Sequence, residues 1–208
     1  IKKKLQTTVH LHDYLPALRE LSNDTGIPKY AANLIYMTSV GHDHIEERII
    51  HSILFMQPKR ADVYWFVHVE VMDSPYDIAY KIDIIEPEEV IRITFKLGFR
   101  ISPRINYFFK KVVEEMVHNQ EIHIQSRFAP LQNHTITGDF RFVVMKRFLS
   151  FENELTLNEK LILKSYFMIK YFSLPDEKEF GLDYSNVTVE KTPLLLTSPR
   201  NIKMVREY

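Results

Sequence analysis

Two histidines on either side of a carboxylate, His42-Asp43-His44, form the most metal-like pattern in the chain. Imidazole and carboxylate groups ligate Zn²⁺, but a zinc site needs further ligands, and His51 lies about two helical turns beyond His44. The chain contains no cysteine, so no thiolate completes the set. We therefore expect no metal site. His42 and His44 stay weak metal candidates in a polar loop whose Asp43 caps the following helix.

A second pattern suits an anion, because Arg100 and Arg104 flank Ser102 at the predicted start of a helix. Guanidinium groups bind phosphate through paired N–H donors, and the first N–H groups of a helix also favour negative charge. A predicted strand ends just before, at Leu97-Gly98, and ligands favour strand carboxyl ends in open α/β sheets. We predict an anion or nucleotide site at Arg100, Ser102 and Arg104. The alternative is that both arginines pair with surface acids.

The common catalytic motifs are missing from the sequence. It has no Gly-x-Gly-x-x-Gly loop, no P-loop, no His-Glu-x-x-His and no Gly-x-Ser-x-Gly. Its five glycines are too scattered to cradle a phosphate. We expect no catalytic residues, no cofactor and no enzymatic activity. The alternative is a free-standing α/β enzyme that acts on a phosphorylated small molecule through His42, Asp43 and His44.

Apolar runs rich in β-branched and aromatic residues predict the strands that position these groups. A buried strand covers 31–38 and a central strand covers 62–71, while 80–84 and 90–97 alternate as a hairpin does. A further strand covers 140–148. Short strand-like runs at 187–189 and 194–196 are separated by Pro193. The strands alone predict a sheet with one antiparallel hairpin.

Helical periodicity predicts four helices between these strands. The first follows Asp13 as N-cap and buries Leu15, Leu18 and Leu21, and the second runs from 45 to 56 with Asp43 and Glu46 as a capping pair. The third begins at Ser102-Pro103 with proline at its first position, and the fourth covers 156–172. Strands and helices interleave, so we predict an α/β layered domain with a mixed, mostly parallel sheet and flanking helices. Residues 1–28 form a juxtamembrane segment and helix, and 29–208 form one domain.

The charge balance excludes nucleic acid as a partner class, because 27 basic residues face 27 acidic ones and no global field results. The basic residues are unevenly placed, with Lys2, Lys3 and Lys4 at the start. A lysine run of this kind is typical of the cytoplasmic end of a membrane span. The alternatives are a solvated helix start, or a module that binds an anionic membrane surface through its basic ends.

Four stretches, in this order, resemble the cytosolic C-terminal region of bacterial KUP/HAK/KT potassium uptake permeases. They are IPKYAANLIY at 27–36, PKRADVYWF at 58–66, LGFR at 97–100 with PRIN at 103–106, and GDFRFV at 138–143. A further segment, 181–191, resembles the Firmicute-type members. The similarity covers essentially the whole chain, and the order and spacing of the motifs are its specific part.

The resemblance implies a regulatory and oligomerising domain of a membrane potassium importer. In that family, transmembrane helices would precede Ile1 and would carry K⁺/H⁺ symport, so potassium ions and protons would be handled outside this chain. Lys2–Lys4 would then lie at the cytoplasmic face of the cell membrane. Some members are inhibited by cyclic di-AMP, which makes this dinucleotide the leading ligand for the arginine site. We also expect a homodimer that covers exposed sheet edges.

Overall fold

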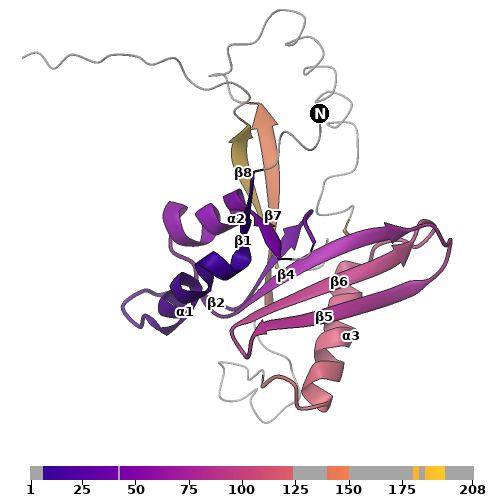
Figure 1. Cartoon of the computed structure of the whole chain (residues 1–208), viewed down its shortest axis with the longest axis horizontal. Coiled ribbons are helices and arrows are strands. Elements are labelled where there is room, and N and C mark those ends of the chain that lie inside the picture. Colours follow the sequence, from indigo (N-terminus) through magenta and orange to yellow (C-terminus); the bar gives the residue numbers. More distant parts are fainter. Residues whose placement is uncertain (1–6, 42, 124–139, 150–179, 183–185, 195–208) are drawn as a thin grey trace, which may run out of the picture.

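The computed structural model describes residues 7–41, 43–123, 140–149, 180–182 and 186–194 (Figure 1). Its centre is a six-stranded sheet in the order β5-β6-β4-β2-β7-β8. The β5–β6 pair is antiparallel, and the other four pairings are parallel. The mixed, mostly parallel sheet and its antiparallel hairpin are therefore confirmed. The strands of this sheet are β2 (Lys29–Thr38), β4 (Arg60–Met72), β5 (Ile78–Glu86), β6 (Val90–Gly98), β7 (Phe140–Leu149) and β8 (Val187–Leu194).

Helices cover the two faces of this sheet and give three layers (Figure 1). On one face lie the 3₁₀ turn η2 (Leu11–Tyr14), α1 (Leu15–Asn23), α2 (Glu47–His51) and the π-helix η3 (Ser52–Met56); α3 (Ile105–His118) covers the other. A small antiparallel sheet pairs β1 (Thr8–His10) with β3 (His44–Glu46). Within the described ranges, no helix has the length and apolarity to cross a bilayer.

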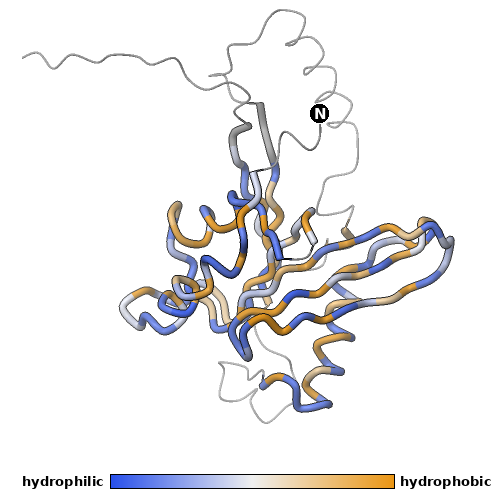
Figure 2. Tube along the Cα trace, viewed as in Figure 1, coloured by the Kyte–Doolittle hydropathy of each residue, from blue (hydrophilic) through white to orange (hydrophobic). Residues whose placement is uncertain are grey.

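The alternation of side chains along the central strand β4 builds both cores. Val63, Trp65 and Val67 pack toward α3, whereas Tyr64 and Phe66 pack toward α1 and α2. All five are at most 9% exposed, so β4 has the nearly continuous apolar sequence of a strand buried on both faces. The hairpin differs, because hydrophobic and hydrophilic residues alternate along β5 (Figure 2).

The predicted starts of α1 and α2, which lie on the same face of the sheet, are both wrong. Asp13 lies within η2, and Tyr14 occupies the N-cap of α1 without a side-chain bond. The predicted 45–56 helix begins only at Glu47, because His44–Glu46 form β3. Asp43 and Glu46 are therefore not a capping pair: Glu46 turns its carboxylate toward the end of β2 instead.

The predicted start of α3 is also wrong by three residues. The helix begins at Ile105 with Arg104 at its N-cap, so Ser102 and Pro103 lie outside it. The backbone of Arg104 is not helical (φ −93°, ψ 64°), and the Ile105 N–H donates to the Phe180 carbonyl at 3.0 Å. The helix buries an apolar stripe at helical spacing, formed by Ile105, Phe109, Val112, Val113 and Met116.

The C-terminal strands correct one further expectation. Val187–Leu194 is a single strand that includes Pro193, not two runs separated by it. Proline is tolerated in β8 because this strand lies at an end of the described sheet. The predicted helix at 156–172 and residues 195–196 lie outside the described residues. The division at residue 28 stays a prediction, although Leu11, Leu15, Leu18 and Leu21 share a core with β2.

Candidate functional site

The chain adds strands to the sheet first on one side of β2 and then, from β7 onward, on the other side. From β2 the chain adds β4 and then the β5–β6 hairpin on one side; it then passes through α3 and adds β7 on the other side of β2. In open α/β sheets, such a switch point leaves a crevice at the strand carboxyl ends where ligands bind. The carboxyl end of β2 is therefore the first place to look for polar groups.

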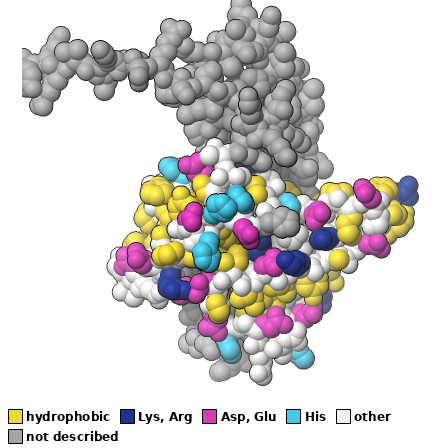
Figure 3. All heavy atoms as spheres, viewed as in Figure 1, with side chains coloured by type: hydrophobic (Ala, Val, Ile, Leu, Met, Phe, Trp, Pro, Cys, Tyr) yellow, Lys and Arg dark blue, Asp and Glu magenta, His cyan; other side chains and the backbone are white. Residues whose placement is uncertain are grey.

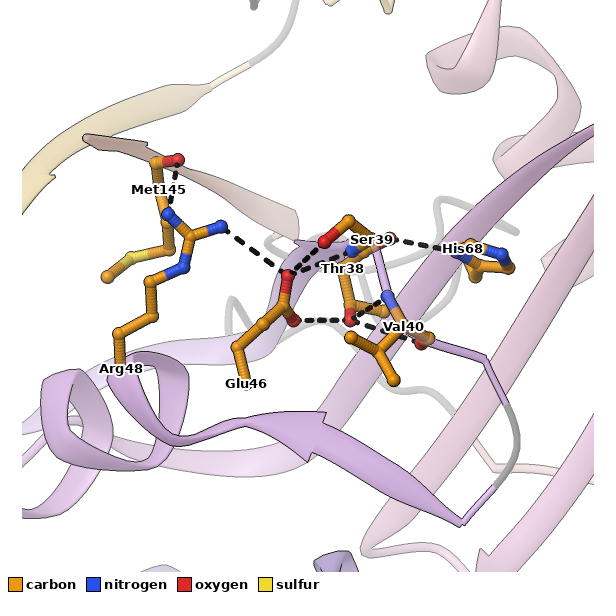
Figure 4. Close-up of polar contacts among 7 residues, drawn as sticks. All are labelled: Thr38, Ser39, Val40, Glu46, Arg48, His68 and Met145. Atoms are coloured by element: carbon orange, nitrogen blue, oxygen red, sulfur yellow. Dashed lines mark hydrogen bonds and ion pairs between the residues drawn. The ribbon is translucent and has the colours of Figure 1, made fainter. Parts of the chain in front are cut away.

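Glu46 is the buried acid at this place, with 0% of its surface exposed. Its Oε2 accepts the Thr38 hydroxyl at 2.5 Å, and its Oε1 accepts the Ser39 amide N–H at 3.0 Å and the Ser39 hydroxyl at 2.6 Å (Figure 4). Thr38 ends β2 and Ser39 follows it, so the carboxylate closes the turn that leaves the sheet.

Arg48 links this carboxylate to the strand across the switch point. Its Nη2 lies 3.4 Å from Glu46 Oε1, and its Nη1 donates to the Met145 carbonyl of β7 at 3.3 Å (Figure 4). On the other side, His68 of β4 places Nδ1 3.0 Å from the Thr38 carbonyl. Three neighbouring strands, β4, β2 and β7, are therefore joined at one end by polar contacts.

The charge state of Glu46 follows from these contacts. Burial raises the pKa of Glu46. Hydrogen bonds from Ser39 and Thr38 and the positive charge of Arg48 lower it by more than burial raises it, so the pKa lies below its ordinary value. An ionised carboxylate whose oxygens already accept several donors is poorly suited to take up a proton in catalysis. The cluster joins β2, α2 and β7 through polar contacts.

A second buried polar cluster joins the same helical layer to β8. Lys59 is 5% exposed, and its Nζ donates to the Ser52 carbonyl at 2.6 Å and lies 3.1 Å from Glu190 Oε1. The Ser52 hydroxyl contacts Glu190 and, at 2.7 Å, the Tyr36 hydroxyl. Ser52 opens the π-helix, a distortion that proteins often place at functional positions.

Of the two histidines that were weak metal candidates, the structure describes only His44. His44 lies in β3, and its ring is 4.1 Å, centroid to centroid, from the ring of His10 on β1. His42 lies outside the described residues. No group of three or more potential metal ligands occurs in the part of the chain that the structure describes.

Arg100 and Arg104 are exposed, as is Ser102 between them. The Arg100 guanidinium lies 5.8 Å from the Tyr76 ring centroid and 5.9 Å from that of Phe99, and its Nη1 donates to the Tyr76 hydroxyl at 2.9 Å. The first helical N–H group, that of Ile105, is already bonded to Phe180 and is not free for a ligand. Lys2, Lys3 and Lys4 lie outside the described residues.

The sequence interpretation missed the residues of both buried clusters. The sequence places Glu46 in a helix cap, and no pattern in it singles out Lys59. One signal was present: Thr38 and Ser39 directly follow a buried strand, and strand carboxyl ends collect polar groups in this fold class. No local pattern connects Lys59 to Glu190, because β8 enters the sheet only in the tertiary structure.

Comparison with known proteins gives one consistent result. The family described as K⁺ potassium transporter C-terminal domain matches residues 31–194. A probable potassium transport system protein Kup of Cytophaga hutchinsonii is 46% identical over the whole chain, and those of Flavobacterium johnsoniae and Clostridium perfringens are 45% and 39% identical over 99% and 100% of it. No solved structure matches the chain.

The alignments also show how much of each relative the chain represents. It spans 31–32% of their lengths, about a third. The family match runs from Ala31 in β2 to the end of β8, so it contains the six-stranded sheet except for the first two residues of β2. The chain belongs to the family of K⁺ potassium transporter C-terminal domains.

Proposed function

We propose that this chain is the regulatory, non-catalytic part of a potassium uptake protein in the cell membrane. The observation that carries the proposal is the similarity, over the whole chain, to proteins named as potassium transport system proteins of which it spans a third. K⁺/H⁺ symport then belongs to a transmembrane part, and this chain lies on the cytoplasmic side with Lys2–Lys4 next to the membrane. The hydrogen bonds that Glu46 already accepts from Thr38 and Ser39 support the non-catalytic role.

A regulatory domain needs two states that its ligand distinguishes. We propose an anionic ligand, with cyclic di-AMP as the leading candidate, at Arg100, Ser102 and Arg104. The aromatic rings of Tyr76 and Phe99 beside Arg100 support a nucleotide, because a base stacks on aromatic side chains and guanidinium groups donate hydrogen bonds to its phosphates. We also propose that the domain self-associates as a two-fold dimer, the commonest closed assembly.

Complementation tests the main proposal. A bacterial strain that lacks its own potassium uptake systems should grow at low external potassium when it carries the full-length protein that contains this chain. Removing residues 29–208 should change potassium uptake in a direct rubidium or potassium influx assay. Full-length protein that moves no potassium, or a purified chain that turns over a phosphorylated small molecule, would contradict the proposal.

A further inference from the structure

β5 forms one edge of the sheet that the structure describes. β5 pairs only with β6 among the described strands. The Asp77 carbonyl accepts the Gly98 N–H at 2.8 Å, so Asp77 and every second residue after it turn their backbone groups toward β6. The residues between them, Ile78, Tyr80, Ile82 and Ile84, therefore turn their N–H and C=O groups toward the open edge.

The side chains of this strand divide into an apolar face and a charged face. On the face shared with α3, Ile78, Tyr80 and Ile84 are 52%, 40% and 43% exposed. On the other face, Lys81 and Asp83 form an ion pair of 2.7 Å within the strand. Figure 3 shows acidic and basic side chains interspersed with hydrophobic ones over the lobe that β5 borders. Isolated edge strands with exposed apolar residues are normally covered or blocked.

The order of these residues is complementary to itself when the strand is reversed. In an antiparallel pair with a two-fold axis at Ile82, Ile82 lies opposite its own copy. Lys81 then lies opposite the partner's Asp83, and Tyr80 opposite the partner's Ile84. The two charged pairs occupy the narrow, non-hydrogen-bonded positions, where cross-strand side chains are closest.

The neighbouring registers lack this complementarity. In a two-fold strand pair, residues that lie opposite each other must point to the same side of the joined sheet. The two-fold axis must therefore pass through a residue, and not between two residues. An axis at Lys81 would place two lysines opposite each other, and an axis at Asp83 would place two aspartates together. Like charges directly opposite destabilise a strand pair. The charges therefore favour the register centred on Ile82 over those centred on Lys81 and Asp83.

The opposite end of the described sheet is less suited to strand addition. β8 contains Pro193, which has no N–H to donate to a further strand. β5 contains no proline between Ile78 and Glu86. Strand pairing between copies is thus favoured at β5.

We propose that two copies of this chain join through β5, antiparallel and centred on Ile82, so that their six-stranded sheets become one continuous sheet. The inference deepens the proposed self-association and rests on it. Because both copies use the same edge, the contact closes on itself and gives a dimer and not a fibre. The strand that pairs with the outer edge of β5 is then β5 of a second copy of the chain.

The absence of cysteine from the sequence permits a sharp test of the register. In Ile82→Cys, the Cα atoms of the two cysteines in the dimer would lie about 5.5 Å apart, within the range of a disulfide. The control is Ala79→Cys, which is exposed on the other face of β5, whereas Ile82 is partly buried. Its two copies would lie six residues apart along the strand, roughly 20 Å. Under mild oxidation, Ile82→Cys should form a covalent dimer on a non-reducing gel, and Ala79→Cys should not.

Charge exchange gives an independent measurement of the same contact. Lys81→Asp and Asp83→Lys should each raise the dimer dissociation constant about tenfold or more, because each creates two like-charge pairs. The double variant restores opposite charges and should recover the wild-type constant. Sedimentation at about 100 μM protein, where a weak contact is populated, provides the readout.

The outcomes separate this interface from self-association itself. A wild-type chain that is monomeric under these conditions overturns both. A wild-type dimer whose Ile82→Cys variant forms no disulfide, or whose double charge variant stays as weak as the single ones, overturns the β5 interface and leaves dimerisation standing. Equal crosslinking at residues 79 and 82 also overturns the register.

Discussion

Lys59 and Glu190 form an ion pair of 3.1 Å that joins the segment before β4 to β8. The side chains are only 6% and 14% exposed. Because the removal of one partner leaves a buried charge uncompensated, Lys59→Met should lower the free energy of unfolding by about 3–5 kcal/mol. Urea unfolding followed by the fluorescence of Trp65, the single tryptophan, measures this change.

The matched control for this prediction is the exposed pair of Lys111 and Glu114, 3.6 Å apart. Lys111→Met should change stability by less than about 1 kcal/mol, because exposed pairs are screened by water. Glu190→Gln should cost less than Lys59→Met, because its amide retains hydrogen-bonding contact with Ser52. Equal costs for Lys59→Met and Lys111→Met would contradict the buried pair.

Glu46 predicts a pH dependence of stability. Its pKa is lower in the folded chain than its ordinary value of 4.5. The stabilisation is therefore complete above about pH 4.5 and is lost as the pH falls through the lower, folded pKa. Glu46→Gln should cost roughly 1.5–3 kcal/mol at neutral pH, and the difference from wild type should shrink in acid. The exposed neighbour Glu47, changed to Gln, should show neither effect.

Replacing Arg100 or Arg104 by alanine should reduce the affinity of the chain for an anionic ligand. Arg100→Ala and Arg104→Ala should each weaken binding of cyclic di-AMP at least about tenfold, since a charge-assisted phosphate contact contributes roughly 1.5–3 kcal/mol. Calorimetric titration checks this, with Lys111→Ala, an exposed cation on α3, as the control. Wild-type affinity in both arginine variants would place any such ligand elsewhere.

A side chain at position 98, at the end of β6, should clash with neighbouring backbone atoms. A Cβ atom there would lie 2.6 Å from the carbonyl carbon and oxygen of Pro75 and 2.7 Å from the Ser74 oxygen. These are backbone atoms, so Gly98→Ala should destabilise the chain by roughly 1–3 kcal/mol. At Gly41 the nearest atom is 3.5 Å away, on the His68 ring. Gly41→Ala is the comparison and should be nearly neutral in thermal unfolding.

The fold was largely predictable because its strands carry strong local patterns. β2, β4 and the β5–β6 hairpin follow from apolar runs and alternation, and the α3 stripe follows from helical spacing. Helix starts were less predictable. Asp13 and Glu46 have the residue type and position of capping residues, but Asp13 lies within η2 and Glu46 accepts hydrogen bonds at the end of β2.

The buried polar clusters show the limit of local reasoning more clearly. Glu46 is buried because Thr38 and Ser39 meet it at a turn, and Lys59 is buried because β8 brings Glu190 to it. Both depend on the strand order, in which neighbours in space are far apart in sequence. Spacing along the chain does not contain that information.

The position of β2 in the sheet has a consequence for folding during synthesis. β2 pairs with β4 on one side, but its other neighbour, β7, begins only at Phe140. Until Phe140 and the residues after it have been made, a growing chain therefore carries β2, a strand with buried side chains, without its β7 neighbour. Such non-local pairing slows folding, and an open apolar edge recruits other chains. Products truncated before Phe140 should consequently aggregate and not persist as smaller folded units.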